Sequence, residues 1–61
     1  MTRKDYELIA AAIREEVNLW RDGSESQHMV GKTAKAISTA LAKDNPRFDR
    51  DRFLRACGIE V

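Results

Sequence analysis

The sequence predicts a small all-α domain, in which a long antiparallel helical hairpin is closed by a short C-terminal helix. Three observations predict it. Apolar residues recur at helical spacing in two long segments, the pair Asp22-Gly23 marks a turn between them, and the last third of the chain carries both start and stop signals for a third helix. At 61 residues, the chain makes one domain, spanning 1–61, near the lower limit for independent folding.

The first helix is expected over about 3–20. Thr2 can cap it, with Asp5 three positions later as an acidic variant of the capping box. At helical spacing one face of this segment is apolar and should pack on the core. The residues of this face are Tyr6, Ile9, Ala10, Ile13, Val17 and Trp20.

A second, narrower apolar stripe runs along the same helix and consists of Leu8, Ala12 and Leu19. A helix that is apolar on two sides needs two neighbours, and a chain of this length has little core to offer. We therefore predict that these three residues form a self-association surface and that the protein is a homo-oligomer, with a homodimer as the expected form.

The second helix is expected over about 26–43. Its cap is either Ser24, with Gln27 in the reciprocal position, or Ser26, and the sequence does not decide between them. Several of its contact positions are alanines: its core-facing line is Val30, Ala34, Ile37 and Leu41, and the flanking residues are Met29, Thr33, Ala36 and Ala40. Small side chains let helices approach closely, so we expect the two long helices to pack tightly against each other.

The third helix is expected over about 50–57. Asp49 is the predicted N-cap, Phe48 and Phe53 have the spacing of a hydrophobic staple, and Gly58 can end the helix in a left-handed conformation. The core predicted for the whole domain consists of Tyr6, Ile9, Ile13, Val17, Trp20, Val30, Ile37, Leu41, Phe48, Phe53 and Leu54.

The charge balance is even, with 11 basic and 10 acidic side chains interspersed along the chain. A protein that binds nucleic-acid backbones usually has a clear positive excess, so nucleic acid is the less favoured partner. The single cysteine excludes an internal disulfide, and no apolar run is long enough for a membrane span or a signal peptide. We expect a cytoplasmic protein without membrane contact.

No motif for catalysis stands out. The segment from Ser26 to Thr33 is one glycine short of a phosphate-binding loop, but no strand precedes it, so we interpret Gly31 as a point of close helix approach. His28 and Cys57 are each the only residue of their type, which leaves a metal site without its usual ligands. The sequence therefore predicts no catalytic residue, metal ion or cofactor, and no enzymatic activity.

Four arginines surround the expected third helix: Arg47, Arg50, Arg52 and Arg55. They are the candidate contacts of an alternative function, a nucleic-acid-binding regulator. Two features weigh against it, because the connection before the helix is longer than a tight helix-turn-helix turn, and Asp49 and Asp51 would repel phosphates. A solvated surface of paired arginines and aspartates is the preferred interpretation.

The two ends of the chain carry distinctive segments. They are Thr2-Arg3-Lys4-Asp5-Tyr6 with Ile9 and Ala10, and Asn45-Pro46-Arg47-Phe48-Asp49-Arg50 with Arg52-Phe53-Leu54 and Ala56-Cys57-Gly58. These segments resemble the two ends of a family of small bacteriophage and prophage proteins. The resemblance implies an accessory protein made in the cytoplasm of an infected bacterium, and it carries over no site residue. The expected function is protein–protein interaction, by self-association and with a host or phage protein as target.

Overall fold

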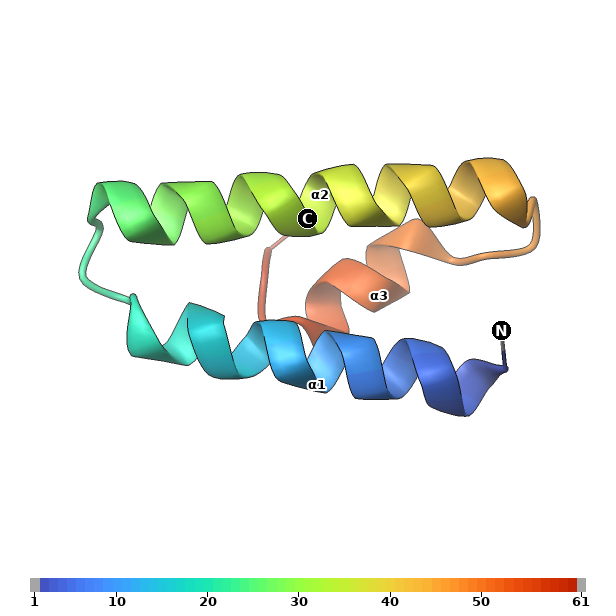
Figure 1. Ribbon diagram of the computed structural model, residues 1–61, viewed down its shortest axis with the longest axis horizontal. Coiled ribbons are helices and arrows are strands. Elements are labelled where there is room, and N and C mark those ends of the chain that lie inside the picture. Colours follow the sequence, from blue (N-terminus) through green and yellow to red (C-terminus); the bar gives the residue numbers. More distant parts are fainter. Residues whose placement is uncertain (1, 61) are drawn as a thin grey trace.

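Two long antiparallel helices and a short third helix between them make up the fold (Figure 1). The computed structural model describes residues 2–60, and within them the helices are α1 (Arg3–Leu19), α2 (Glu25–Asp44) and α3 (Arg50–Ala56). The all-α, three-helix prediction is confirmed. The molecule measures 33 × 18 × 14 Å, so it is elongated along α1 and α2.

A complete capping box begins α1. The backbone N–H of Asp5 donates to Thr2 Oγ1 at 3.3 Å, and the Thr2 N–H donates to Asp5 Oδ2 at 2.9 Å. Two backbone donors that have no partner inside the helix are thereby satisfied. The hydrogen bond that the Asp5 carboxylate accepts from the Thr2 backbone N–H, and secondarily its interaction with the Thr2 side chain, lower the pKa of the Asp5 carboxyl.

The cap of α2 is Ser24, which accepts from the Gln27 N–H at 3.3 Å, while Ser26 lies inside the helix. The turn before it uses Gly23 at φ +77°, a conformation that favours glycine. The helix ends at Asn45, whose extended backbone (φ −134°, ψ 102°) is the conformation that the following proline imposes.

The start of α3 follows the predicted signals. The Asp49 carboxylate accepts from the Arg52 N–H at 3.0 Å. The rings of Phe48 and Phe53 lie 5.4 Å apart between centroids and form the hydrophobic staple. Tyr6 of α1 joins them, with its ring 4.8 Å from that of Phe48, so three aromatic rings tie α3 to the start of α1.

The end of α3 is a Schellman motif. Gly58 adopts φ +82° and donates its N–H to the carbonyl of Arg55 at 2.9 Å, and the Ile59 N–H donates to the carbonyl of Leu54 at 3.0 Å. This pair of bonds satisfies carbonyls at the helix end and turns the chain back toward the core. A helix of seven residues thus has both ends closed.

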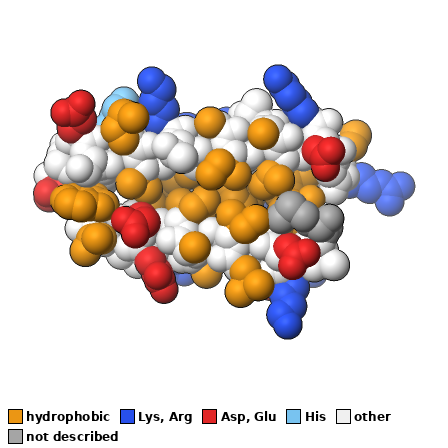
Figure 2. Space-filling view, in the orientation of Figure 1, with side chains coloured by type: hydrophobic (Ala, Val, Ile, Leu, Met, Phe, Trp, Pro, Cys, Tyr) orange, Lys and Arg blue, Asp and Glu red, His pale blue; other side chains and the backbone are white. Residues whose placement is uncertain are grey.

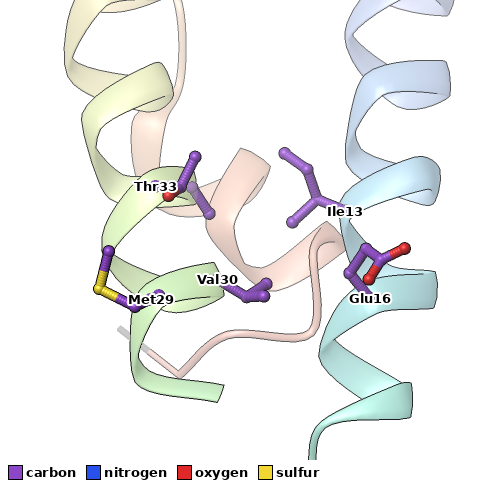
Figure 3. A pocket seen from close by; sticks show the side chains of 6 residues that line it. Ile13, Glu16, Met29, Val30 and Thr33 are labelled. Atoms are coloured by element: carbon purple, nitrogen blue, oxygen red, sulfur yellow. The ribbon is translucent and has the colours of Figure 1, made fainter. Parts of the chain in front are cut away.

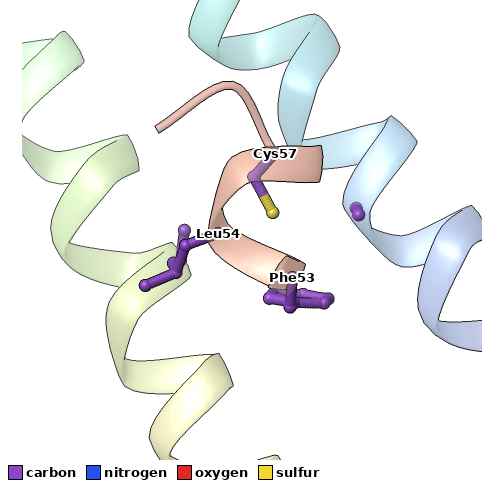
Figure 4. Packing of buried hydrophobic residues seen from close by; sticks show 5 residues of the cluster. Phe53, Leu54 and Cys57 are labelled. Carbon is purple, nitrogen blue, oxygen red and sulfur yellow. The ribbon is translucent and has the colours of Figure 1, made fainter. Parts of the chain in front are cut away.

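The core lies where α3 wedges between the two long helices (Figure 4). Leu54 points toward α2, while Phe53 and Cys57 lie between α3 and α1. Half-buried side chains from all three helices pack around this cluster. The fully or almost fully buried residues are Ala10, Val17, Ala34, Ser38, Phe53, Leu54 and Cys57.

Two expectations about packing are wrong. Trp20 is not a core residue, because α1 ends at Leu19 and leaves the indole 37% exposed. Gly31 is not a point of close approach, since a Cβ placed there would meet nothing within 4 Å. Ala34 of α2 belongs to the same buried cluster as Ala10 of α1 and Leu54 of α3, so its small side chain serves the contact of α2 with both other helices.

Within residues 2–60, none of the helices combines the length and the apolar character needed to cross a membrane.

Candidate protein-interaction face

The side of the α1–α2 hairpin away from α3 exposes apolar side chains. Figure 2 shows hydrophobic atoms gathered along the line where the two long helices meet, with lysine and arginine side chains toward the margins of the view. We call this surface the open face. Its residues are Leu8, Ala12, Ile13, Glu16 and Leu19 of α1, and Met29, Val30, Thr33, Ala36 and Ala40 of α2.

A hollow of about 250 Å³ lies at the centre of the open face. Ile13 of α1 and Val30 of α2 extend toward each other across it, and Thr33 lies beside them (Figure 3). Glu16 supplies the charge among the six lining residues, and it stands at the α1 rim. The hollow is therefore an apolar depression with an acidic edge, suited to an apolar side chain of another protein.

Large apolar side chains are exposed on the same two helices, and one of them, Met29, lines the hollow. Leu8 is 62% exposed, Leu19 is 68% exposed and Met29 is 51% exposed. Leu8, Ala12 and Glu16 follow one another at intervals of one helical turn, so the predicted stripe of α1 runs into the hollow's rim. Single exposed leucines are ordinary on a protein surface, whereas several large apolar side chains on one side of a helical hairpin mark a candidate interaction surface.

The half of the open face contributed by α2 was not identified from the sequence. Ala36 and Ala40 are exposed and lie one turn apart, and Met29 lies seven residues before Ala36 on the same side of the helix. The available signal was the flanking row of small residues beside the core line of this helix. That row was attributed to close packing against the first helix, so its exposure was overlooked.

The arginines around α3 do not form a single patch. Arg47 and Arg52 line one hollow of about 550 Å³ together with Arg3 of α1, and Arg55 lines a different hollow beside Gly58. Arg50 lies 4.0 Å from the Asp51 carboxylate, on the solvated helix surface. The structure thus brings together two of the four predicted arginines and adds one that sequence reasoning missed.

The hollow that contains Arg47 and Arg52 has an aromatic wall and mixed charges. Tyr6, Phe48 and Phe53 line it, and so do the carboxylates of Glu7 and Asp49. Glu7 lies 3.5 Å from Arg3 as an exposed ion pair, and Asp49 caps α3. These carboxylates offset much of the positive potential that three arginines would otherwise offer to an anion.

The titratable groups offer little reactivity. Cys57 is buried under α3, and burial raises the pKa of its thiol, so the nucleophilic thiolate is disfavoured. His28 is exposed on the first turns of α2. Among residues 2–60, no cluster of three or more histidine, cysteine or acidic side chains could hold a metal ion.

No family model, curated protein or solved structure matches this chain. The open face and the arginine-lined hollow are the two surfaces whose geometry indicates a function. Of the two, the open face is the larger departure from an ordinary surface, because large apolar side chains on it are more than half exposed to water.

Proposed function

We propose that this protein is a non-catalytic interaction module that binds another protein chain through the open face. The observation that carries the proposal is the exposure of Leu8, Leu19 and Met29, each more than half exposed, on the two helices that form an apolar hollow lined by Met29 itself. Covering such side chains contributes about 25 cal/mol for each Å² of apolar surface removed from water. A protein partner is the kind of ligand that covers apolar area spread along two helices.

The thin core supports the same proposal. Six apolar residues are buried in the chain described here, and two of them are alanines. Small domains bury a low fraction of their surface and often depend on association for stability. Contact with a partner would extend this core through the hollow between α1 and α2.

The setting that we propose is that of a phage or prophage accessory protein in the cytoplasm of an infected bacterium. Its support is the resemblance of the two ends of the chain, from Thr2 to Tyr6 and from Asn45 to Gly58, to small phage proteins. In that setting the protein self-associates and acts on a host or phage protein.

A second candidate function is nucleic-acid binding through the arginine-lined hollow. The observation that favours it is the meeting of Arg3, Arg47 and Arg52 beside the half-buried rings of Tyr6 and Phe48, a combination that can hold a phosphate and a base. The carboxylates in the same hollow make it the weaker candidate. Its test is the salt dependence of binding described in the Discussion.

Site-specific photocrosslinking tests the proposed function. A photoreactive amino acid is placed at Ala36 on the open face and, as a matched control, at Lys35, whose side chain is turned by about 100° around α2. In bacterial cells that express the protein, we expect protein adducts from position 36 and few from position 35. Equal yields from both positions, or adducts that persist in Leu8→Glu, would contradict the proposal.

A further inference from the structure

The two helices of the open face are complementary to each other. α1 presents the large side chains of Leu8 and Leu19, whereas α2 presents the small side chains of Ala36 and Ala40. Large side chains pack best into the gaps between small ones on a facing helix. The surface that fits α1 is therefore α2, and the surface that fits α2 is α1.

We infer that the open face binds a second copy of the chain, in a twofold-symmetric dimer that lays α1 of each copy across α2 of the other. The symmetry axis lies between the copies and runs along the long direction of the molecule. A twofold interface is made of the same patch on both chains, so every α1-to-α2 contact occurs twice. The inference rests on the proposed function and names the partner of the open face.

At the Leu8 end of the face, the register of the two helices places a large side chain opposite small ones. Ile13 and Glu16 share the central hollow with Val30 and Thr33, and α1 and α2 are antiparallel (Figures 1 and 3). Continuing this register, Leu8 is level with the gap between Ala36 and Ala40. A twofold axis that runs along the length of the molecule leaves the position of each residue along that length unchanged, so the same residues face one another between the two copies.

Each Leu8 thus enters the gap between the alanines of the second copy. Leu19 reaches the level of Met29 in the second copy in the same way. The contact therefore covers three of the large apolar side chains that the isolated chain leaves exposed, Leu8, Leu19 and Met29.

The charges at the edges of the open face agree with the same arrangement. Exposed Glu16 of α1 falls within about one helical turn of Lys32 in the second copy, and exposed Asp5 falls within about one turn of Lys43. Two acidic groups of α1 thus lie close to the level of two lysines of α2 in the second copy. Such pairs add little affinity, but they favour one orientation of the two chains over others.

The accessible surface of the chain is large enough for this contact. It measures 4636 Å², about 600 Å² more than the roughly 4,000 Å² expected of a folded monomer of 7.0 kDa. A stable interface removes about 800 Å² from each partner. Covering the open face would bring the exposed area of each chain to that of a typical small protein or below.

The test is sedimentation equilibrium of the purified full chain over a wide concentration range. The wild-type protein should be a dimer, and Leu8→Glu should raise the dissociation constant about 30-fold or more while leaving the helical content unchanged, because this side chain is 62% exposed in the single chain.

Charge reversal tests the orientation. Glu16→Lys and Lys32→Glu should each weaken the dimer about fivefold or more, since each breaks two symmetry-related pairs, and the double variant should recover to within about twofold of the wild type. Lys35→Glu is the matched control and should change the dissociation constant less than about twofold. This arrangement would be overturned if Leu8→Glu left the dissociation constant of the dimer unchanged. It would also be overturned if the double variant bound no more tightly than the single variants.

The outcomes separate this inference from the proposed function. A monomer at every concentration would overturn the second copy as partner. If crosslinking from position 36 still gave protein adducts, and none of them had the mass of two copies of this chain, the open face would be an interaction surface for a different protein. A monomer that gave no adducts from position 36 would contradict both the dimer and the proposed function.

Discussion

Replacing Gly31 by alanine should stabilise the protein. Gly31 lies inside α2 with ordinary helical backbone angles, and an added Cβ would meet nothing within 4 Å. Glycine in a helix interior is about 0.8–1.0 kcal/mol less favourable than alanine, because it loses more backbone freedom on folding. Nothing in the surroundings of Gly31 opposes that gain, so Gly31→Ala should add about 1 kcal/mol to the free energy of unfolding.

The other two glycines are matched controls with the opposite expectation. Gly23 and Gly58 have φ values of +77° and +82°, where an L side chain costs about 1–2 kcal/mol. Gly23 has open space around it, so Gly23→Ala measures the backbone cost alone. A Cβ at Gly58 would lie 3.6 Å from side-chain atoms of Arg14 and Val17, which is ordinary contact, so Gly58→Ala should cost a similar amount.

The assay is thermal unfolding followed by far-ultraviolet circular dichroism, with all variants at one chain concentration because association stabilises the folded state. For a domain of this size, 1 kcal/mol corresponds to a shift in Tm of roughly 4–8 °C. Gly31→Ala should melt higher than the wild type and the two controls lower. A lower Tm for Gly31→Ala would refute the reasoning, because it would mean that another part of the chain occupies the space beside this turn of α2.

Three further predictions concern the core, the first cap and the arginines. Leu54→Ala should lower the free energy of unfolding by about 2–5 kcal/mol, because it removes a buried side chain. The total free energy of unfolding expected for a domain of this length is roughly 3–9 kcal/mol, so the loss is a large part of it. A denaturant midpoint close to that of the wild type would contradict the packing of α3. The Thr2 hydrogen bonds lower the pKa of the Asp5 carboxyl below its usual 3.8, so the ionised carboxylate stabilises the fold near neutral pH and this stabilisation is lost as pH falls through the lowered pKa. Asp5→Asn should therefore be less stable than the wild type at pH 7, and the difference in stability should vanish in acid. A difference in stability that does not depend on pH would contradict the role of the cap. If the chain binds DNA through the arginine-lined hollow, binding should weaken steeply with added salt and Arg47→Glu with Arg52→Glu should abolish it; binding that survives both substitutions would exclude this site.

The fold could be predicted because local signals agree along the chain. The Thr2–Asp5 capping box, the Phe48–Phe53 staple and the Gly58 stop each depend on residues a few positions apart, and all three are present in the structure. Such motifs involve backbone groups whose partners are fixed by the helix itself. They can therefore be identified without knowing how the helices pack.

Packing was harder to predict, because it depends on where α3 lies. Ser38 is completely buried and uses its hydroxyl to donate to the Lys35 carbonyl at 2.7 Å, which removes the cost of burying it. A polar residue satisfied within its own helix gives no periodic apolar signal. Trp20 shows the opposite error, since its spacing fits the core stripe but the helix ends one residue before it.

The candidate face was only half visible in the sequence for a related reason. Leu8, Ala12 and Leu19 are apolar residues outside the main stripe, so they stand out as a second surface. Ala36 and Ala40 are compatible with burial or exposure, and only the position of α3 on the other side of the hairpin shows that they are exposed. The accessible area of the folded chain, which exceeds that expected of a monomer of this mass, likewise cannot be predicted from the sequence pattern.

The most direct test of the account is the solution mass of the wild-type protein beside that of Leu8→Glu. The central claim is that the open face is covered by a second copy of the chain. It predicts twice the 7.0 kDa chain mass for the wild type at micromolar concentration and the single-chain mass for Leu8→Glu. A wild-type protein that keeps the single-chain mass as its concentration rises toward millimolar would contradict it.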